Sequence, residues 1–186
     1  MNAMIVDSTA LAEQVCADVL NSAFDSAGQR CSALRVLCVQ EEVADHMITM
    51  IKGAMDEWRV GNPALLNTDI GPVIDAEAQQ NLLAHIEKMK SVARAHHEIA
   101  LPEGAEQGTF VAPVLFELND LDELQREVFG PVLHVVRYAA GALDALIATY
   151  RPDGLWLPLE AASRWPGAER HTSQGGYVLI GLKNGT

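Results

Sequence analysis

The segment comprising residues 34–40 constrains the fold more than any other part of the chain. It is an apolar run with β-branched residues, which is typical of a strand covered on both faces. Residues 11–23 carry an apolar side chain at every fourth position, which predicts a helix before this strand. Residues 41–60 predict a second helix after it, which ends at a Gly-Asn-Pro sequence.

Strands and helices alternate along the rest of the chain. Residues 1–6 predict a strand, and Asp7-Ser8-Thr9 offers an N-cap for the helix that follows. Asp75 is expected to cap a third helix ending near residue 95. The remaining predictions are a polar linker at 96–108, strands at 109–118 and 131–138, and a short helical turn at 121–127. This order predicts an α/β domain whose largely parallel sheet is flanked by helices.

The composition changes after residue 149. Proline, tryptophan and a Gly-Gly pair interrupt every long period in residues 150–186, so we expect little regular structure there. The sequence Ser173-Gln174-Gly175-Gly176 lacks the Lys-Ser/Thr ending of a phosphate loop, and therefore predicts a turn. We accordingly divide the chain into a domain at 1–149 and a divergent tail at 150–186.

Size and charge exclude several classes of protein. A chain of 186 residues with 49% hydrophobic residues is long enough for one domain with a core. The net charge is -12 and there is no long run of Lys or Arg, so we expect neither nucleic acid nor an anionic membrane as a partner. No apolar stretch has the length of a membrane span, and no secretory signal is apparent, so the expected location is cytoplasmic.

The three cysteines differ in their surroundings. Cys16 shares a helical face with apolar residues and Cys38 lies inside the central strand, so both are expected in the core. Cys31 instead stands among small residues, directly after Arg30 and just before the strand. A neighbouring cation and oriented backbone N–H groups favour the thiolate, which is the reactive form. Cys31 is therefore a candidate nucleophile.

The histidines give no independent sign of a catalytic or metal site. No pair has helical i,i+4 spacing with a supporting carboxylate, so no metal site is predicted. A cysteine hydrolase would need a histidine beside Cys31, and the sequence places none there. We expect four of them on the surface and His134 in a structural role within its strand; the four are His46, His85, His96 and His97.

A second informative stretch is Glu127-Val128-Phe129-Gly130-Pro131. From its position alone, Glu127 is best explained as a solvated carboxylate at the end of a helical turn. A carboxylate beside an exposed phenylalanine is also able to bind ribose hydroxyls while the ring packs on a flat heterocycle. The spacing does not decide between these two alternatives.

These two stretches together resemble the aldehyde dehydrogenase superfamily. The resemblance rests on Gly28-Gln29-Arg30-Cys31 and on the motif that begins at Glu127. Across residues 2–149 the sequence is similar to the L-glutamate-γ-semialdehyde (Δ1-pyrroline-5-carboxylate) dehydrogenase domain of bacterial proline utilization A proteins. The resemblance implies part of an aldehyde dehydrogenase catalytic domain, NAD as cofactor and a small-molecule aldehyde as substrate.

The resemblance also implies roles for individual residues. Cys31 would form a hemithioacetal and then a thioester, and its own backbone N–H would help to stabilise the oxyanion. Ser32 would lie near the substrate carboxylate, and Glu127 and Phe129 would contact NAD. Arg30 has two alternatives, which stay open: it tunes the thiol, or it is a structural ion-pair partner.

Other parts of the family pattern are not found in this sequence. The family's general base is a Glu in a Glu-x-Gly-Gly stretch just before the residues matched by Asn2-Ala3-Met4, and the dinucleotide-binding domain precedes it. A one-base shift near residue 149 would restore the family's next segment, so we expect a frameshifted or truncated gene. The first interpretation is thus an aldehyde dehydrogenase fragment that is inactive alone. The alternatives are a non-catalytic remnant, a module that associates through surface exposed by the missing domain, and, less favoured, a cysteine hydrolase.

Overall fold

The computed structural model describes residues 1–149, 168–172 and 177–182. Within these residues, strands form one sheet in the order β3-β4-β5-β2-β1-β7-β6. The strands are β1 (Asn2–Val6), β2 (Leu34–Gln40), β3 (Ala95–Glu98), β4 (Val114–Leu118), β5 (Val132–Tyr138), β6 (Ala168–Thr172) and β7 (Tyr177–Leu182). The α-helices are α1 (Ala12–Phe24), α2 (Glu41–Asp56), α3 (Ala76–Val92) and α4 (Leu143–Thr149). Short 3₁₀ turns lie at Asp25–Gly28, Ala105–Gln107 and Leu121–Glu123.

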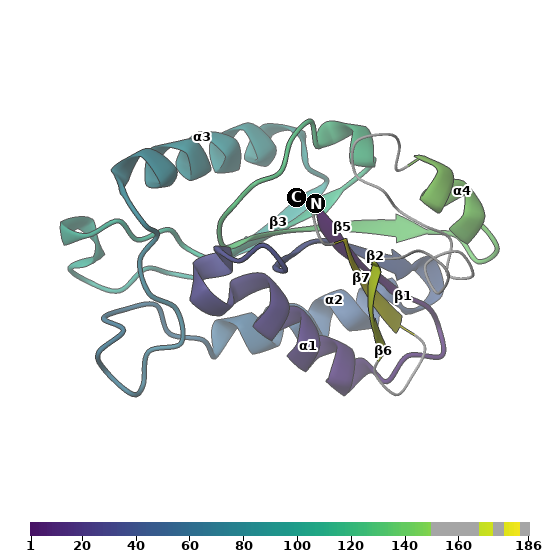
Figure 1. Cartoon of the computed structure of the whole chain (residues 1–186), viewed down its shortest axis with the longest axis horizontal. Coiled ribbons are helices and arrows are strands. Elements are labelled where there is room, and N and C mark those ends of the chain that lie inside the picture. The colour runs from purple at the N-terminus through teal and green to yellow at the C-terminus, as the bar shows by residue number, and fades with distance from the viewer. Residues whose placement is uncertain (150–167, 173–176, 183–186) are drawn as a thin grey trace.

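The centre of the sheet is parallel. β4, β5, β2 and β1 pair in parallel, and β3 is added antiparallel at the β4 edge. In Figure 1, α1 and α2 lie on one face of the sheet and α3 lies on the other. The α/β class and the largely parallel sheet flanked by helices are therefore confirmed.

The double cover explains why the central strands are so apolar. Six of the seven residues of β2 and six of the seven of β5 are buried. The helices contribute one face each, as with Val15, Val19 and Ala23 of α1, all fully buried. Burial of this kind supplies most of the stability of a small domain.

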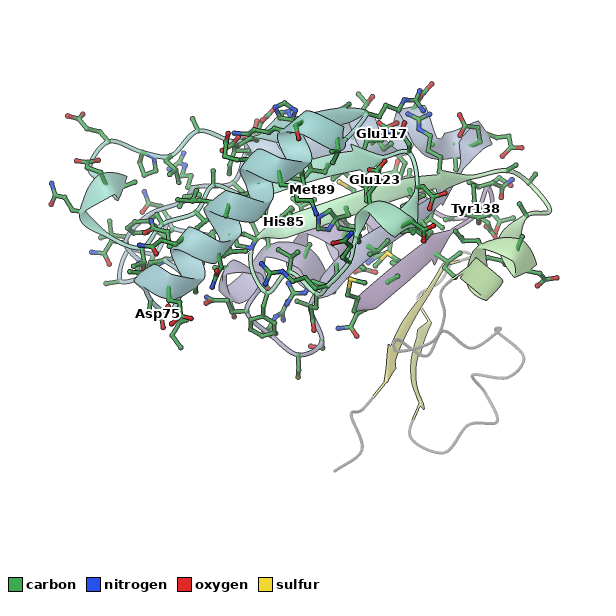
Figure 2. The ribbon with its side chains drawn as sticks, turned by 90° about the horizontal axis from the view of Figure 1, so that it is seen from above. Asp75, His85, Met89, Glu117, Glu123 and Tyr138 are labelled. Atoms are coloured by element: carbon green, nitrogen blue, oxygen red, sulfur yellow. The ribbon has the colours of Figure 1, made fainter. Side chains whose placement is uncertain are left out.

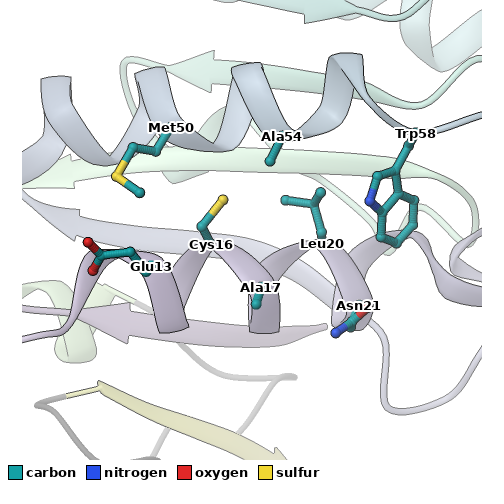
Figure 3. Close-up of a pocket in the computed structure, with 8 residues that line it drawn as sticks. All are labelled: Glu13, Cys16, Ala17, Leu20, Asn21, Met50, Ala54 and Trp58. Atoms are coloured by element: carbon teal, nitrogen blue, oxygen red, sulfur yellow. The ribbon is translucent and has the colours of Figure 1, made fainter.

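The packing of α1 on α2 leaves a groove of about 450 Å³ between the two helices. Figure 3 shows Cys16 of α1 and Met50 of α2 reaching into the space between them, with Trp58 at one end. Trp58 also packs edge-on against Phe24, with ring centroids 6.3 Å apart. The expected packing role of Cys16 fits this position, since its side chain is 7% exposed.

Several local predictions were wrong. Asp7 does not cap α1, because its carboxylate accepts from the backbone N–H and the hydroxyl of Thr9 instead. The second helix ends at Asp56 rather than at residue 60. Residues 96–108 are not only linker: β3 begins at Ala95, and its two histidines pair with β4.

Of the remaining boundaries, the strand expected at 109–118 begins only at Val114, and the third helix ends at Val92 where an end near residue 95 was expected. Asp75 caps α3, and its side chain accepts from the backbone N–H of Ala78 at 2.8 Å. The helical turn expected at 121–127 is present only at Leu121–Glu123, so Glu127 lies in an irregular segment and not at a helix end.

The expectation of little regular structure after residue 149 falls largely outside the described residues. The described part of the tail contains β6 and β7, which that expectation did not include. These strands pair with one another, and β7 pairs antiparallel with β1. The turn expected at 173–176 lies outside the described residues.

Candidate active site

Cys31 lies at the tip of a tight turn between α1 and β2. The backbone N–H of Ala33 donates to the carbonyl of Arg30 at 3.1 Å, so Cys31 and Ser32 occupy the two central positions of the turn. Both residues are exposed. Cys16 and Cys38, in contrast, are buried, and burial raises the pKa of the Cys16 thiol. Cys31 is thus the accessible thiol of the three.

The turn is held in place by Asn2 of β1. Its side-chain amide donates to the carbonyl oxygens of Cys31 at 2.7 Å and of Ala33 at 3.0 Å. Because β1 is itself paired with β2, the amide joins the turn at Cys31 to the sheet. Sequence reasoning did not identify Asn2 as part of the site.

The backbone that leads to Cys31 has an unusual conformation. Ser26, Ala27 and Gly28 all have positive φ, at 56°, 53° and 66°. A Cβ on Gly28 would lie 2.2 Å from the carbonyl oxygen of Gly130. Only glycine permits so close an approach of the two backbones, so Gly28 brings the two sequence motifs into direct contact.

Arg35 is the residue that joins the two motifs. It is 1% exposed, and its Nε lies 3.3 Å from a carboxylate oxygen of Glu127. The other two guanidinium nitrogens donate to the carbonyls of Gly130 at 3.1 Å and Arg30 at 3.3 Å. Burial lowers the pKa of this guanidinium, and the charge of Glu127 opposes that shift. One buried cation therefore binds both the Glu127 segment and the turn that carries Cys31.

An irregularity in the sheet lies at Arg35. Asn2 pairs with Leu34 and Ala3 with Val36, so the register between β1 and β2 shifts at Arg35. Such bulges re-aim a side chain and are common beside functional sites. The sequence signal for Arg35 was a charge within an apolar strand, but its partners were not derivable from spacing.

Glu127 and Phe129 are partly exposed beside a pocket. Their side chains are 43% and 47% exposed, and both line a pocket of about 360 Å³. The guanidinium of Arg35 lies 4.8 Å from the centroid of the Phe129 ring. Gln29 also lines this pocket, and its side-chain oxygen accepts from the backbone N–H of Ile74. The motif around Cys31 and the motif that begins at Glu127 thus both contribute residues to the lining of this pocket.

Arg30 contacts the end of α1. One guanidinium nitrogen donates to the carbonyls of Asn21 at 2.6 Å and Ser22 at 3.3 Å. A cation at this position satisfies the last carbonyls of a helix and interacts favourably with its dipole. These contacts support the structural alternative for Arg30. The partners are backbone carbonyls, however, and not the carboxylate of an ion pair.

One prediction for the histidines was wrong. His85 is not simply a surface residue, because its ring contacts His134 at 3.0 Å between the two Nε2 atoms. His46 and His96 are exposed, as expected, and His97 is partly exposed. In the described part of the chain no histidine hydrogen-bonds to Cys31, and the cysteine-hydrolase alternative requires one.

Among the described residues, no group of three or more His, Cys, Asp or Glu side chains is placed to hold a metal ion. No helix in the described ranges combines the length and apolar character that crossing a bilayer requires.

Comparison with known proteins places this geometry in context. The profile of the aldehyde dehydrogenase family matches residues 1–148. The bifunctional protein PutA of Klebsiella aerogenes is 59% identical over 170 residues, which is 88% of this chain and 13% of that protein. The chain therefore spans a small part of this relative.

Two solved structures are also similar. A crystal structure of bifunctional proline utilization A has a TM-score of 0.75 and 55% identity, and covers 78% of this chain and 14% of its own. A betaine aldehyde dehydrogenase from Staphylococcus aureus in complex with NAD+ has a TM-score of 0.68 and 25% identity, over 74% of this chain and 28% of its own.

Proposed function

The chain belongs to the aldehyde dehydrogenase family, and on that basis we propose that it is a segment of an NAD-dependent L-glutamate-γ-semialdehyde dehydrogenase of proline catabolism. The observation that carries this proposal is the position of Arg35, which hydrogen-bonds to Glu127 and to the turn that holds Cys31. The similarity to PutA proteins supports the choice of substrate. The aldehyde dehydrogenase fold, expected as part of a catalytic domain, is confirmed.

In the proposed reaction Cys31 is the nucleophile. Its thiolate attacks the aldehyde carbon, a C–S bond forms, and the carbonyl electrons move to the oxygen. The backbone N–H of Cys31 has no acceptor within the described part of the chain, so it is available to the resulting oxyanion. Ser32, exposed next to Cys31, is proposed to contact the substrate carboxylate.

The residues present fit the nicotinamide end of NAD. The Glu127 carboxylate is fixed by Arg35 on one oxygen and partly exposed, which suits it to accept hydrogen bonds from ribose hydroxyls. The Phe129 ring is exposed beside it and suits a flat heterocycle. NAD, when bound, supplies the hydride acceptor that oxidises the carbon attached to Cys31.

Hydrolysis of the Cys31 thioester needs an activated water. The 186-residue polypeptide made alone is proposed not to complete this cycle, because the Glu-x-Gly-Gly stretch that carries the family's general base is not found in its sequence. The location we propose is the cytoplasm, where thiols stay reduced, since no disulfide joins the three cysteines.

An acylation experiment tests the role of Cys31 without the cofactor. The purified chain is mixed with p-nitrophenyl acetate: the thiolate attacks the ester carbon, the C–O bond breaks and p-nitrophenolate leaves. We expect a burst close to one equivalent of p-nitrophenolate, with the acetyl group found by mass spectrometry on the peptide that contains Cys31. NADH formation from the semialdehyde is expected to stay at background in the same preparation.

Matched cysteine variants control this experiment. The burst is expected to disappear in Cys31→Ser and to persist in Cys16→Ala, whose thiol is buried. Acylation distributed over the other cysteines, or no burst at all in the folded chain, would overturn the assignment of Cys31. NADH formation at a rate typical of enzymes would overturn the claim that the polypeptide is inactive alone.

A further inference from the structure

A pair of histidines lies behind the residue that joins the two motifs. His134 of β5 is 1% exposed, and its Nδ1 lies 3.2 Å from the carbonyl oxygen of Arg35. Its Nε2 lies 3.0 Å from Nε2 of His85, a half-buried residue of α3. The ring of Phe116 stacks on His134, with centroids 6.2 Å apart. Figure 2 shows His85 on α3 beside the segment that carries Glu123.

The hydrogen bonds determine where the protons are. A carbonyl oxygen only accepts, so Nδ1 of His134 carries the proton that is donated to Arg35. In a neutral ring Nε2 of His134 is then an acceptor, and the proton between the two rings belongs to Nε2 of His85. Nδ1 of His85 is left with a lone pair. With His85 in this tautomer, the arrangement requires a neutral His134, because a protonated His134 would set two N–H donors against each other.

The carbonyl that His134 binds belongs to an irregular part of the sheet. Arg35 falls at the register shift between β1 and β2, and the ladder between β2 and β5 begins one residue later, at Val36. A buried carbonyl must be satisfied by some donor, and the His134 ring supplies one here. His134 therefore holds the backbone of Arg35 through its carbonyl. The side chain of the same residue reaches Glu127 and the carbonyl of Arg30 in the candidate site.

We propose that His134 is a positioning residue for the candidate active site, acting through Arg35, and that His85 holds His134 in the required tautomer. The proposal rests on the proposed function, in which Cys31 is the nucleophile and Glu127 binds the cofactor. His134 touches neither of them. It sets the position of the guanidinium that hydrogen-bonds to Glu127 and to the carbonyl of Arg30, directly before Cys31.

The charges around the pair agree with two neutral rings. Lys88 and Arg126 face His85, and Glu123 and Gln125 line the same pocket of about 490 Å³. Burial, followed by the charges of Lys88 and Arg126, lowers the pKa of His85 to about 4. For His134, burial, the neighbouring His85 and the charge of Arg35 lower the pKa to about 3, although its bond to the Arg35 carbonyl opposes the shift.

The tautomers are tested directly by NMR. Long-range ¹H–¹⁵N spectra of the ¹⁵N-labelled chain at pH 7 are expected to show a protonated Nδ1 and a bare Nε2 for His134, and the reverse for His85. His46→Gln, His96→Gln, His97→Gln and His171→Gln variants assign the other four rings by elimination. A protonated Nε2 on His134 would overturn the proposal.

The positioning role is tested by the rate of Cys31 acylation with p-nitrophenyl acetate. In His134→Leu, and in His85→Leu on the partly exposed helix, we expect the rate at pH 7 to fall about 10-fold or more, because small displacements of reacting groups cost this much. His85→Gln keeps an N–H donor and is expected to recover part of the rate. His97→Leu is the matched control and should acylate like the wild type.

A second readout separates positioning from stability. The ¹H–¹⁵N signal of the Arg35 Nε–H group, which donates to Glu127, is expected to shift in His134→Leu and His85→Leu, although the thermal unfolding of His85→Leu stays close to that of the wild type. Wild-type acylation rates and an unshifted Arg35 signal in both leucine variants would overturn the positioning role, whereas no acylation in the wild type would overturn the proposed function instead.

Discussion

The side-chain amide of Asn2 lies 2.7 Å from the carbonyl oxygen of Cys31 and bridges it to the carbonyl of Ala33, 3.0 Å from the same nitrogen. This one side chain closes the turn that presents the candidate nucleophile. It comes from the strand next to β2, so the position of the turn depends on the pairing of two strands that are far apart in sequence.

The first prediction concerns this amide. Asn2→Ala removes two hydrogen bonds, an exposed one to Cys31 and a partly buried one to Ala33, so the free energy of unfolding should fall by about 1 to 2 kcal/mol. The Cys31 turn should also become more mobile, and alkylation of Cys31 by iodoacetamide should change in rate while Cys16 stays protected. Asn67→Ala, on an exposed loop, is the control. Equal unfolding midpoints for both variants would contradict the bridging role.

The second prediction compares two glycines. Gly28→Ala places a Cβ 2.2 Å from the carbonyl oxygen of Gly130 at a backbone with φ +66°, so the two loops must separate. We expect a loss of about 3 kcal/mol or more in unfolding free energy. Gly53→Ala in α2 meets nothing within 4 Å and should stabilise the chain by about 1 kcal/mol. Urea unfolding of the two variants should therefore shift in opposite directions.

The third prediction concerns Arg35 and its carboxylate. Arg35→Met removes the donors to Glu127, Gly130 and Arg30 and should cost about 2 to 4 kcal/mol, because buried carbonyls lose their partners. Glu127→Gln should cost less, since this carboxylate is 43% exposed. Urea unfolding of the two variants measures the difference, and equal stability losses would argue against Arg35 as the common anchor.

The fourth prediction concerns the N-cap of α3, the helix that carries His85. Asp75, labelled at one end of α3 in Figure 2, accepts from the backbone N–H of Ala78. Asp75→Ala should lower the unfolding free energy by about 1 kcal/mol, and Asp75→Asn by much less, because asparagine caps nearly as well. Thermal unfolding checks both variants. Equal losses would indicate that the negative charge, and not the hydrogen bond, matters there.

The sequence was sufficient for the main elements of the fold. The strand at β2 and the capped helix α3 follow from local patterns of apolar residues and from Asp75, which do not depend on distant parts of the chain. β3 was missed because four residues with two histidines carry no strand pattern of their own. Their pairing with β4 decides their conformation.

The site was predictable only in part, for a related reason. Cys31 was identified as a candidate nucleophile from its neighbours, whereas only the family resemblance favoured a cofactor contact for Glu127, and no spacing rule brings the two together. Arg35 was visible only as a charge in an apolar strand, and its partner Glu127 is 92 residues away. Likewise, each of His85 and His134 stands alone in its own element. Only the crossing of α3 over β5 brings their rings into contact.

The last prediction is the acid sensitivity of the fold. The pKa values of His85 and His134 lie below the ordinary value of 6.5, at about 4 and about 3, so the folded state binds fewer protons than the unfolded state between these limits. The contribution of the two neutral rings to the stability of the fold is complete above pH 6.5. It is lost as the pH falls from 6.5 to the pKa values of the folded state. Each histidine contributes at most about 1.4 kcal/mol per pH unit, and less for the partly exposed His85. From pH 6.5 to 5, where most carboxylates stay ionised, we expect a loss of about 2 kcal/mol by urea unfolding.

A His85→Gln, His134→Gln double variant should be much less sensitive over this range, whereas His46→Gln should behave like the wild type. A wild-type stability that does not change between pH 7 and 5 would show that the two rings are not held neutral.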